Sequence, residues 1–243
     1  MPMTEAAINL SEQKGEFTKK IKEILPDSNM ALCFTCGTCA SGCPATGLEN
    51  MDPRKFVRMV ALGMDEEVMT TPWVWMCTMC QRCIYACPMK VDIPQMVGLA
   101  RQAWPREKRP KGILGSCDMA LKHDTCSAMG TSEEDFQFVV EDVLEEVRET
   151  QPGWEELQAP INKKGATYLL NQNSREPVTE PDEMVPLWKI LHLLGVDWTY
   201  NTKGWAAENY CMFLQDWEAW EHIVRVKAKA VDDLECKYWL NTE

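Results

Sequence analysis

The stretch CFTCGTCASGCP, residues 33–44, decides how the first half of this 243-residue chain folds. A second copy of its pattern, CTMCQRCIYACP, occupies residues 77–88. In both copies two residues separate each of the first three cysteines, a fourth cysteine follows after three more, and a proline comes next. Three thiolates at this spacing can surround one inorganic group from a tight loop, while the fourth begins a segment that leads away from it.

This spacing is typical of proteins that hold two [4Fe–4S] clusters, in which the fourth cysteine of each run binds the other cluster. We therefore predict two such clusters with exchanged fourth ligands. Cluster one takes Cys33, Cys36, Cys39 and Cys87, and cluster two takes Cys77, Cys80, Cys83 and Cys43. No catalytic residue is predicted, because no acid–base constellation accompanies the cluster ligands.

The spacing argues against two other uses of these cysteines. Structural zinc usually takes two pairs of ligands with a longer gap between the pairs. A disulfide framework belongs to oxidising compartments, and the opening residues MPMTE lack the charged and apolar regions of a secretory signal. No run of about 18 apolar residues is present to span a membrane. We expect a cytoplasmic protein with no membrane span.

The charge balance of the chain is acidic. Lys and Arg total 25 and Asp and Glu total 37, which gives a net charge of −12. Such a surface repels nucleic acid, so we expect no nucleic-acid partner. Residues 101–111 are the exception and form either a solvated face or a docking patch for an acidic partner. Their basic side chains are Arg101, Arg106, Lys108, Arg109 and Lys111.

Helices are predicted around the cysteine runs. Residues 4–25 carry a loose apolar stripe that Pro26 ends. Asp52-Pro53 opens a helix that Gly63 ends, and Ile93-Pro94 opens another that runs to about Trp104. The apolar residues 73–76 lead directly into Cys77 and are expected in the core, where they exclude water from the second cluster.

Residues 113–160 are predicted to form an acidic helical linker region. Ser132 caps a helix there, with apolar residues at helical spacing from Phe136 to Val147. Cys117 and Cys126 match no ligand spacing, so we interpret them as buried or free thiols and His123 as an ordinary polar contact.

The last part of the chain alternates strands and helices. Strands are predicted at 166–171, 196–200 and 236–240, and helices at 182–194 and 216–231, which implies a parallel βαβαβ sheet. Ligands of such sheets gather at the carboxyl ends of the strands, here near Asn171, Asn201 and Asn241. The predicted fold class is thus α+β: a helical two-cluster ferredoxin-like domain over 1–112, the linker over 113–160, and a small α/β domain over 161–243.

The first 110 residues or so resemble the C subunit of heterodisulfide reductase. The resemblance rests on both cysteine runs and on CGTCASGCP at 36–44, DPRK at 52–55 and WMCTMC at 75–80. It implies an iron–sulfur subunit that relays electrons between a flavin- and cluster-bearing A-type subunit and a cysteine-rich B-type subunit that handles a disulfide or other sulfur compound. The chain would then be a component of an oxidoreductase, not catalytic alone.

The second half is similar to the opening of the cysteine-rich domain of the family's B and D subunits, through LGVDW at 194–198 and AAENY at 206–210. That domain binds a further cluster through a Cys-Cys-Gly motif, and this sequence has no Cys-Cys pair, which leaves Cys211 and Cys236 as its only candidate ligands. Two alternatives stay open. One is a catalytic subunit with an additional cluster, and the other is the iron–sulfur subunit of a quinone-linked flavoprotein dehydrogenase of the succinate or glycolate type.

Overall fold

The computed structural model describes residues 9–242 and divides the chain into two compact units, Met1–Arg109 and Pro110–Glu243. The sequence predicted a separate linker over 113–160. The structure instead assigns these residues to the second unit, because the helix that they contain packs into that unit's hydrophobic core.

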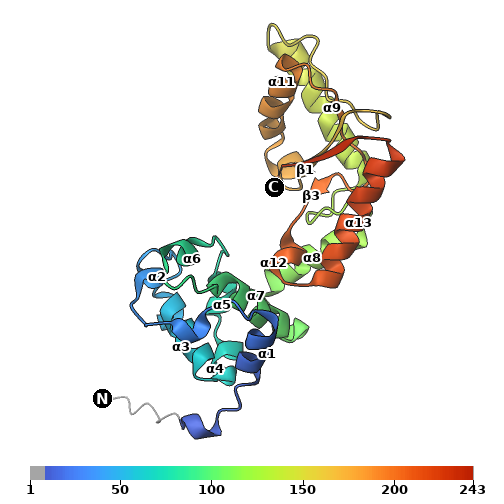
Figure 1. Cartoon of the computed structure of the whole chain (residues 1–243). Coiled ribbons are helices and arrows are strands. Elements are labelled where there is room, and N and C mark those ends of the chain that lie inside the picture. The colour runs from blue at the N-terminus through green and yellow to red at the C-terminus, as the bar shows by residue number, and fades with distance from the viewer. Residues whose placement is uncertain (1–8, 243) are drawn as a thin grey trace, which may run out of the picture. The chain divides into compact units, whose positions relative to one another are not determined.

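The described part of the first unit contains helices and connecting loops (Figure 1). Its α-helices are α1 Glu16–Ile24, α2 Thr38–Ser41, α3 Pro53–Ala61, α4 Asp65–Thr70, α5 Trp73–Met76, α6 Arg82–Ala86 and α7 Ile93–Ala103. Short 3-10 helices are η1 Leu10–Glu12, η2 Met30–Leu32, η3 Leu48–Asn50 and η4 Arg106–Lys108. Helices α3 and α7 begin where the sequence predicts, since Asp52 and Asp92 accept hydrogen bonds from the backbone three residues on.

The first predicted helix is shorter than expected. Residues 4–8 lie outside the described residues, and α1 starts only at Glu16 because Gly15 adopts a left-handed φ of 63°. The carboxylate of Asp65 accepts the N–H groups of Glu16 at 2.6 Å and Phe17 at 3.3 Å. A residue some fifty positions away thus caps the helix, a contact that no local pattern reveals.

The core of the first unit forms between α1, α3, α4, α5 and α7. These helices bury one apolar face each, and the partly buried cysteines of both runs pack against the same cluster. Its fully enclosed side chains include Ile21, Phe56, Val68, Val74, Met96, Val97 and Ala100. The cysteine loops therefore pack directly against the hydrophobic core of the first unit.

The second unit combines helices with a small parallel sheet. Its helices are α8 Lys111–Lys122, α9 Glu133–Thr150, α10 Glu176–Thr179, η5 Pro181–Met184, α11 Val185–Leu193, α12 Tyr210–Phe213 and α13 Trp217–Asp233. Its strands are β1 Tyr168–Asn173, β2 Trp198–Thr199, β3 Ala206–Ala207 and β4 Tyr238–Asn241.

Strand β1 is the centre of the sheet. Its residues Tyr168 and Leu169 pair in parallel with both β2 and β4, so these two strands lie along opposite edges of β1. Strand β3, which the sequence did not predict, pairs in parallel with Gln172 and Asn173 at the end of β1. Two alanines carry too weak a strand pattern to be recognised, and their pairing depends on the neighbouring backbone.

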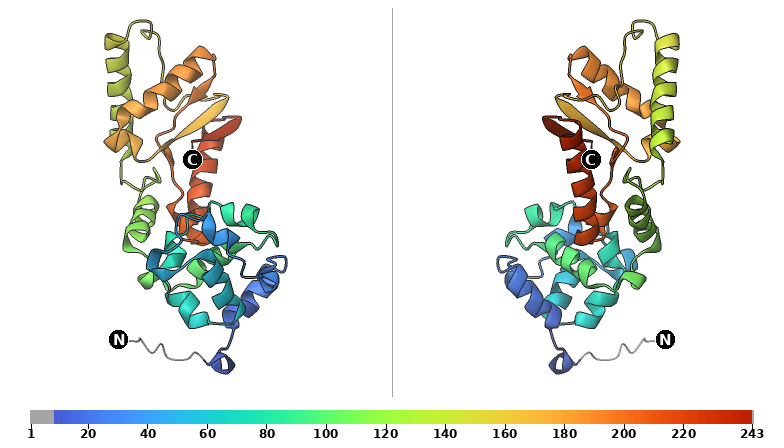
Figure 2. Two further views of the ribbon diagram at one scale, coloured as in Figure 1. Left: turned by 90° about the vertical axis from the view of Figure 1, so that its left-hand side faces the viewer. Right: turned by 90° about the vertical axis from the view of Figure 1, so that its right-hand side faces the viewer.

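Helices cover both faces of this sheet: Figures 1 and 2 show α9 and α11 on one side of it and α13 on the other. Helix α9 contributes Phe136, whose ring stacks on Trp205 at a centroid distance of 4.1 Å. Residues Leu169 to Gln172 of β1 are all buried. Burial on both faces is what a parallel sheet requires.

Candidate functional site

The two cysteine runs fold with the same backbone. In each run the residue before the second cysteine has a positive φ, Thr35 at 61° and Met79 at 55°. The residue after the second cysteine does too, Gly37 at 86° and Gln81 at 64°. Three of these four are not glycine, and a left-handed conformation there costs about 1–2 kcal/mol each. Matching strain at matching positions indicates loops shaped around a bound group.

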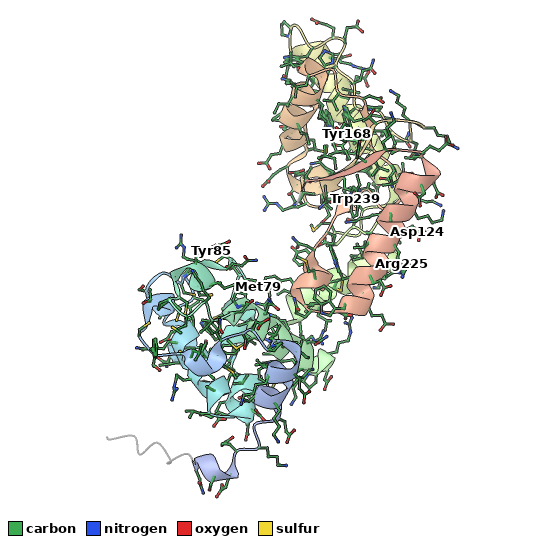
Figure 3. The ribbon with its side chains drawn as sticks, in the orientation of Figure 1. Met79, Tyr85, Asp124, Tyr168, Arg225 and Trp239 are labelled. Carbon is green, nitrogen blue, oxygen red and sulfur yellow. A yellow bond between two sulfur atoms is a disulfide. The ribbon has the colours of Figure 1, made fainter. Side chains whose placement is uncertain are left out.

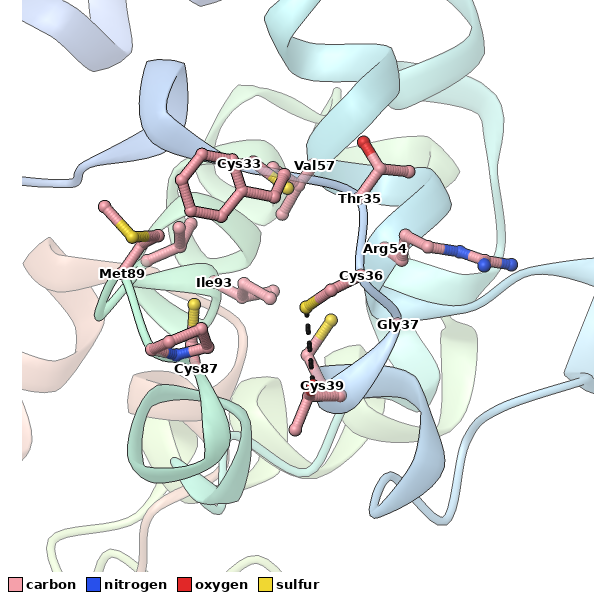
Figure 4. Close-up of a pocket in the computed structure, with 14 residues that line it drawn as sticks. Cys33, Thr35, Cys36, Gly37, Cys39, Arg54, Val57, Cys87, Met89 and Ile93 are labelled. Atoms are coloured by element: carbon pink, nitrogen blue, oxygen red, sulfur yellow. Dashed lines mark hydrogen bonds between the residues drawn. The ribbon is translucent and has the colours of Figure 1, made fainter.

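The first pocket combines cysteines from both runs. It is lined by the first three cysteines of run one and by Cys87 from the end of run two. Figure 4 shows the sulfur atoms of Cys36, Cys39 and Cys87 directed toward its interior. The hydroxyl of Thr38 lies 3.3 Å from the Cys36 sulfur.

The second pocket has the reciprocal composition. Cys77, Cys80 and Cys83 line it together with Cys43 from the end of run one. The structure therefore brings together the residues of each predicted ligand set. The guanidinium of Arg82 donates to the Gly42 carbonyl at 3.1 Å and holds the two runs against each other. Met79 and Tyr85, both labelled in Figure 3, belong to this second run.

Helices α3 and α7 each contribute side chains to both pockets. The side chain of Ile93, at the start of α7, lines both of them and is buried. Helix α3 contributes Pro53 to the second pocket and Val57 to the first. Because these side chains are apolar, this part of each pocket wall excludes water.

Within each pocket the thiols differ in depth. Cys36 and Cys80 are exposed, and hydrogen bonds from Thr38 and from the Arg82 backbone lower their respective pKa values. Burial, with added repulsion from neighbouring cysteines, raises the pKa of Cys39 to about 11 and that of Cys83 to about 12. The inner thiols thus ionise at neutral pH only when a positively charged metal group compensates them.

The donor set fits an iron–sulfur cluster. Each pocket offers four cysteine sulfurs and one arginine, and neither is lined by aspartate, glutamate or histidine. Soft thiolate ligands suit iron–sulfur chemistry. In residues 9–242 no three or more His, Cys, Asp or Glu side chains converge on a position for a single metal ion.

Arg101 is buried and contacts the backbone of Cys77, a cysteine of the second pocket. We predicted it in a solvated or docking patch, but its side chain is fully buried, so that interpretation was wrong for this residue. The missed signal is the spacing, since Arg101 follows Val97 and Ile93 at intervals of four on the buried face of α7. Burial lowers the pKa of Arg101 to about 10, while the nearby Cys77 acts in the opposite direction.

The cysteines of the second unit differ from prediction. Cys117 on α8 and Cys211 on α12 form a disulfide with a Cα–Cα distance of 5.2 Å, so Cys117 is not a free thiol and Cys211 is not available as a cluster ligand. The packing of α8 against α12 brings them together across 94 residues of sequence. Cys126 is a buried free thiol and Cys236 a half-buried one.

The carboxyl ends of β3 and β4 border a cavity of about 310 Å³. Of the three asparagines predicted near strand ends, only Asn241 lines this cavity. The amide of Asn171 donates to the Gly204 and Trp205 carbonyls and has a structural role. The side chain of Asn201 is buried away from it, with no hydrogen-bond partner among the described residues. Trp239, labelled in Figure 3, forms part of the cavity wall.

Comparison with protein families shows that residues 18–92 match a 4Fe-4S dicluster domain. This segment contains all eight cysteines of both runs. The domain model and the sulfur-lined pockets agree, so the protein holds two [4Fe–4S] clusters.

The names of the curated relatives refer to the C subunit of heterodisulfide reductases. Over 86 residues the chain is 41% identical to the C subunit of H(2):CoB-CoM heterodisulfide,ferredoxin reductase from Methanothermobacter marburgensis, covering 35% of this chain and 46% of that protein. It is 25% identical over 187 residues to the iron-sulfur C subunit of CoB--CoM heterodisulfide reductase from Methanopyrus kandleri, covering 77% of this chain and 86% of that protein.

A third relative, from Archaeoglobus profundus, is a protein like the heterodisulfide reductase C subunit. It is 33% identical over 94 residues that cover 35% of this chain and 50% of that protein. The chain spans about half the length of most of the curated relatives it matches. Across residues 9–242 no helix combines the length and apolar character needed to cross a membrane. The chain is an iron–sulfur protein of the electron-transfer type that is like the C subunit of heterodisulfide reductase.

Proposed function

We propose that this chain is the electron-relay subunit of a heterodisulfide-reductase-like complex. The observation that carries the proposal is the pair of four-cysteine pockets, each completed by a cysteine from the other run. When bound, each [4Fe–4S] cluster supplies one-electron oxidation and reduction. Two such clusters in one small unit provide a path for electrons rather than a place for substrate chemistry.

The ligand sets are those predicted from the sequence. Cluster one is held by Cys33, Cys36, Cys39 and Cys87, and cluster two by Cys77, Cys80, Cys83 and Cys43. The lining of each pocket by these four residues supports the assignment. This exchange makes the two runs interdependent. Loss of Cys43 from the first run affects cluster two, and loss of Cys87 from the second run affects cluster one.

The remaining residues of the site position the ligands and shield them. The apolar side chains of Val57 and Ile93 keep water from the inner thiolates. The exposed thiols of Cys36 and Cys80 mark the places where each cluster comes nearest to solvent. We propose that redox partners dock there, one on each loop, which gives separate entry and exit points for electrons.

The proposed partners are a flavin- and cluster-bearing A-type subunit and a cysteine-rich B-type subunit that handles a disulfide or another sulfur compound. The names of the curated relatives, which all refer to heterodisulfide reductases, support this proposal. The cytoplasmic location stays a prediction.

Iron and acid-labile sulfide per chain, measured after anaerobic purification, test the proposal. Eight irons with two interacting EPR signals in the reduced protein are expected. About twelve irons would contradict a pure relay and would favour a catalytic subunit with a further cluster.

Cysteine variants test the ligand exchange. Cys43→Ser should abolish the same EPR signal as Cys80→Ser, and Cys87→Ser the same signal as Cys36→Ser. Cys236→Ser, a half-buried thiol outside both pockets, is the matched control and should retain eight irons. If Cys43→Ser instead abolishes the signal that Cys36→Ser abolishes, the exchange is wrong.

A further inference from the structure

A side chain of the second run contacts the segment that brings Cys43 into the second pocket. The Arg82 guanidinium donates through Nη1 to the carbonyl of Gly42, the residue directly before Cys43, at 3.1 Å. No backbone N–H of the described residues donates to this carbonyl. The Arg82–Gly42 contact therefore joins the loop of three cysteines in the second run to the one cysteine that the first run supplies to the same pocket.

The Arg82–Gly42 contact is close as well as polar. A Cβ atom on Gly42 would lie 3.3 Å from the Cδ of Arg82 and 3.9 Å from its Cγ. The φ of Gly42 is −103°, which residues with side chains also adopt. The missing side chain at this position thus gives room to Arg82, whose methylene groups lie directly against the backbone of residue 42.

Arg82 also contacts the other ligands of the second pocket. It lines the pocket itself, and a hydrogen bond from its backbone lowers the pKa of Cys80. It begins α6, in which Cys83 is the next residue. Helices α2 and α6 pack against each other and are neighbours in Figure 1. One residue thus fixes the position of the three-cysteine loop relative to Cys43.

The first pocket has no equivalent contact. Thr38 occupies the position in the first run that Arg82 occupies in the second, and its hydroxyl contacts Cys36 of its own run at 3.3 Å. The backbone N–H of Cys87 donates to carbonyls of α6, within the second run. Across residues 9–242 no side chain of the first run forms a hydrogen bond with the backbone of residues 86–87. Cys87 is therefore held by its own run, whereas Cys43 is held by the opposite one.

We propose that Arg82 is a positioning residue that keeps Cys43 on cluster two, so that cluster two loses one iron when the Arg82–Gly42 contact is removed. This inference rests on the proposed ligand exchange and states what maintains it. Each iron of a [4Fe–4S] cluster is bound by one cysteine, and here three come from one short loop. The fourth comes from a separate segment, whose distance from that loop the Arg82–Gly42 contact sets.

Oxidation makes the loss of this iron measurable. An oxidised [4Fe–4S]2+ cluster gives one electron to ferricyanide, which becomes ferrocyanide. The fourth iron then parts from the Cys43 sulfur and from three sulfides and leaves as Fe2+, and a [3Fe–4S]+ cluster remains. Hydrogen bonds from charged groups are stronger than neutral ones, and solvent weakens them at an exposed residue such as Arg82. We therefore expect removal of the contact to accelerate this loss about 5- to 10-fold.

The experiment exposes the loaded, full-length protein to ferricyanide without oxygen and follows the EPR signal of [3Fe–4S]+. The signals of the reduced protein are assigned beforehand with Cys36→Ser and Cys80→Ser, each of which removes one. Arg82→Met should form [3Fe–4S]+ about 5- to 10-fold faster than the unmodified protein. The signal that Cys80→Ser removes should disappear at that rate, and the other should persist. Lys90→Met is the control for charge, because Lys90 is exposed, contacts the Tyr85 carbonyl and lies outside both pockets. It should match the unmodified protein.

A second variant keeps the test decisive if Arg82→Met binds neither cluster. Gly42→Val fills the space beside the Arg82 methylenes and leaves the charge of Arg82 in place, and it should accelerate the same loss. An unchanged rate in the loaded variant, equal conversion of both clusters, or the same acceleration in Lys90→Met would overturn the inference. These results leave the relay intact. The ligand exchange fails separately if Cys43→Ser removes the signal that Cys36→Ser removes, and the relay fails if the unmodified chain binds only one cluster.

Discussion

The disulfide between Cys117 and Cys211 should stabilise the second unit strongly. Both residues are fully buried, and 94 positions of sequence separate them, so the bond closes a loop that contains most of the unit. A cross-link over about 100 residues removes about 4.7 kcal/mol of loop-closure entropy from the unfolded chain. Strain and residual structure reduce such values, and we expect the Cys117→Ala, Cys211→Ala double variant to lose about 3–5 kcal/mol.

Guanidinium unfolding, followed by tryptophan fluorescence in the cluster-free protein, measures this loss. The second unit contains seven of the ten tryptophans, so its transition dominates the signal. The transition should move to lower denaturant in the double variant and in the unmodified protein under reductant. Cys126→Ala controls for the loss of a buried sulfur outside the bond. A double variant that unfolds at the same denaturant concentration as Cys126→Ala would refute the reasoning.

Three further outcomes are expected. Phe136→Ala removes a fully buried ring that stacks on Trp205, and it should lower the free energy of unfolding by about 3–5 kcal/mol. Urea denaturation measures this loss. A loss below about 1 kcal/mol would contradict that packing. Asp52→Ala removes the carboxylate that caps α3 by accepting the Lys55 N–H at 2.7 Å, and should cost about 1 kcal/mol in the same assay. Burial raises the pKa of Tyr200, so its neutral form is favoured in the folded state, and stability should fall as pH rises above the ordinary tyrosine value of about 10. Tyr200→Phe should weaken that alkaline decrease, and an unchanged pH profile would refute the assignment.

Local sequence patterns determined the part of the protein that depends on short-range chemistry. Both cysteine runs could be identified as cluster-binding loops because ligand spacing and the following proline are properties of twelve consecutive residues. The starts of α3 and α7 followed from Asp52-Pro53 and from Ile93-Pro94, since a proline is favoured in the first turn of a helix. The predicted helix from Ser132 also formed, as α9, because its apolar spacing is regular.

Tertiary structure decided everything that depends on which distant segments meet. The disulfide required α8 and α12 to pack together, and a spacing of 94 residues carries no local signal for that contact. Strand β3 exists because the end of β1 offers it backbone partners, although two alanines have little strand preference of their own. The late start of α1 reflects capping by Asp65 from a later segment.

Arg101 shows most clearly where sequence reasoning reaches its limit. Its basic neighbours placed it in a surface patch, whereas its position on the apolar face of α7 buried it beside the second pocket. A prediction from residue type alone places a charged side chain at the surface, because most charged side chains are exposed to solvent. Only the packed structure shows the carbonyls of Val74 and Cys77 that make burial of this charge possible, because hydrogen-bond partners distant in sequence come together only on folding.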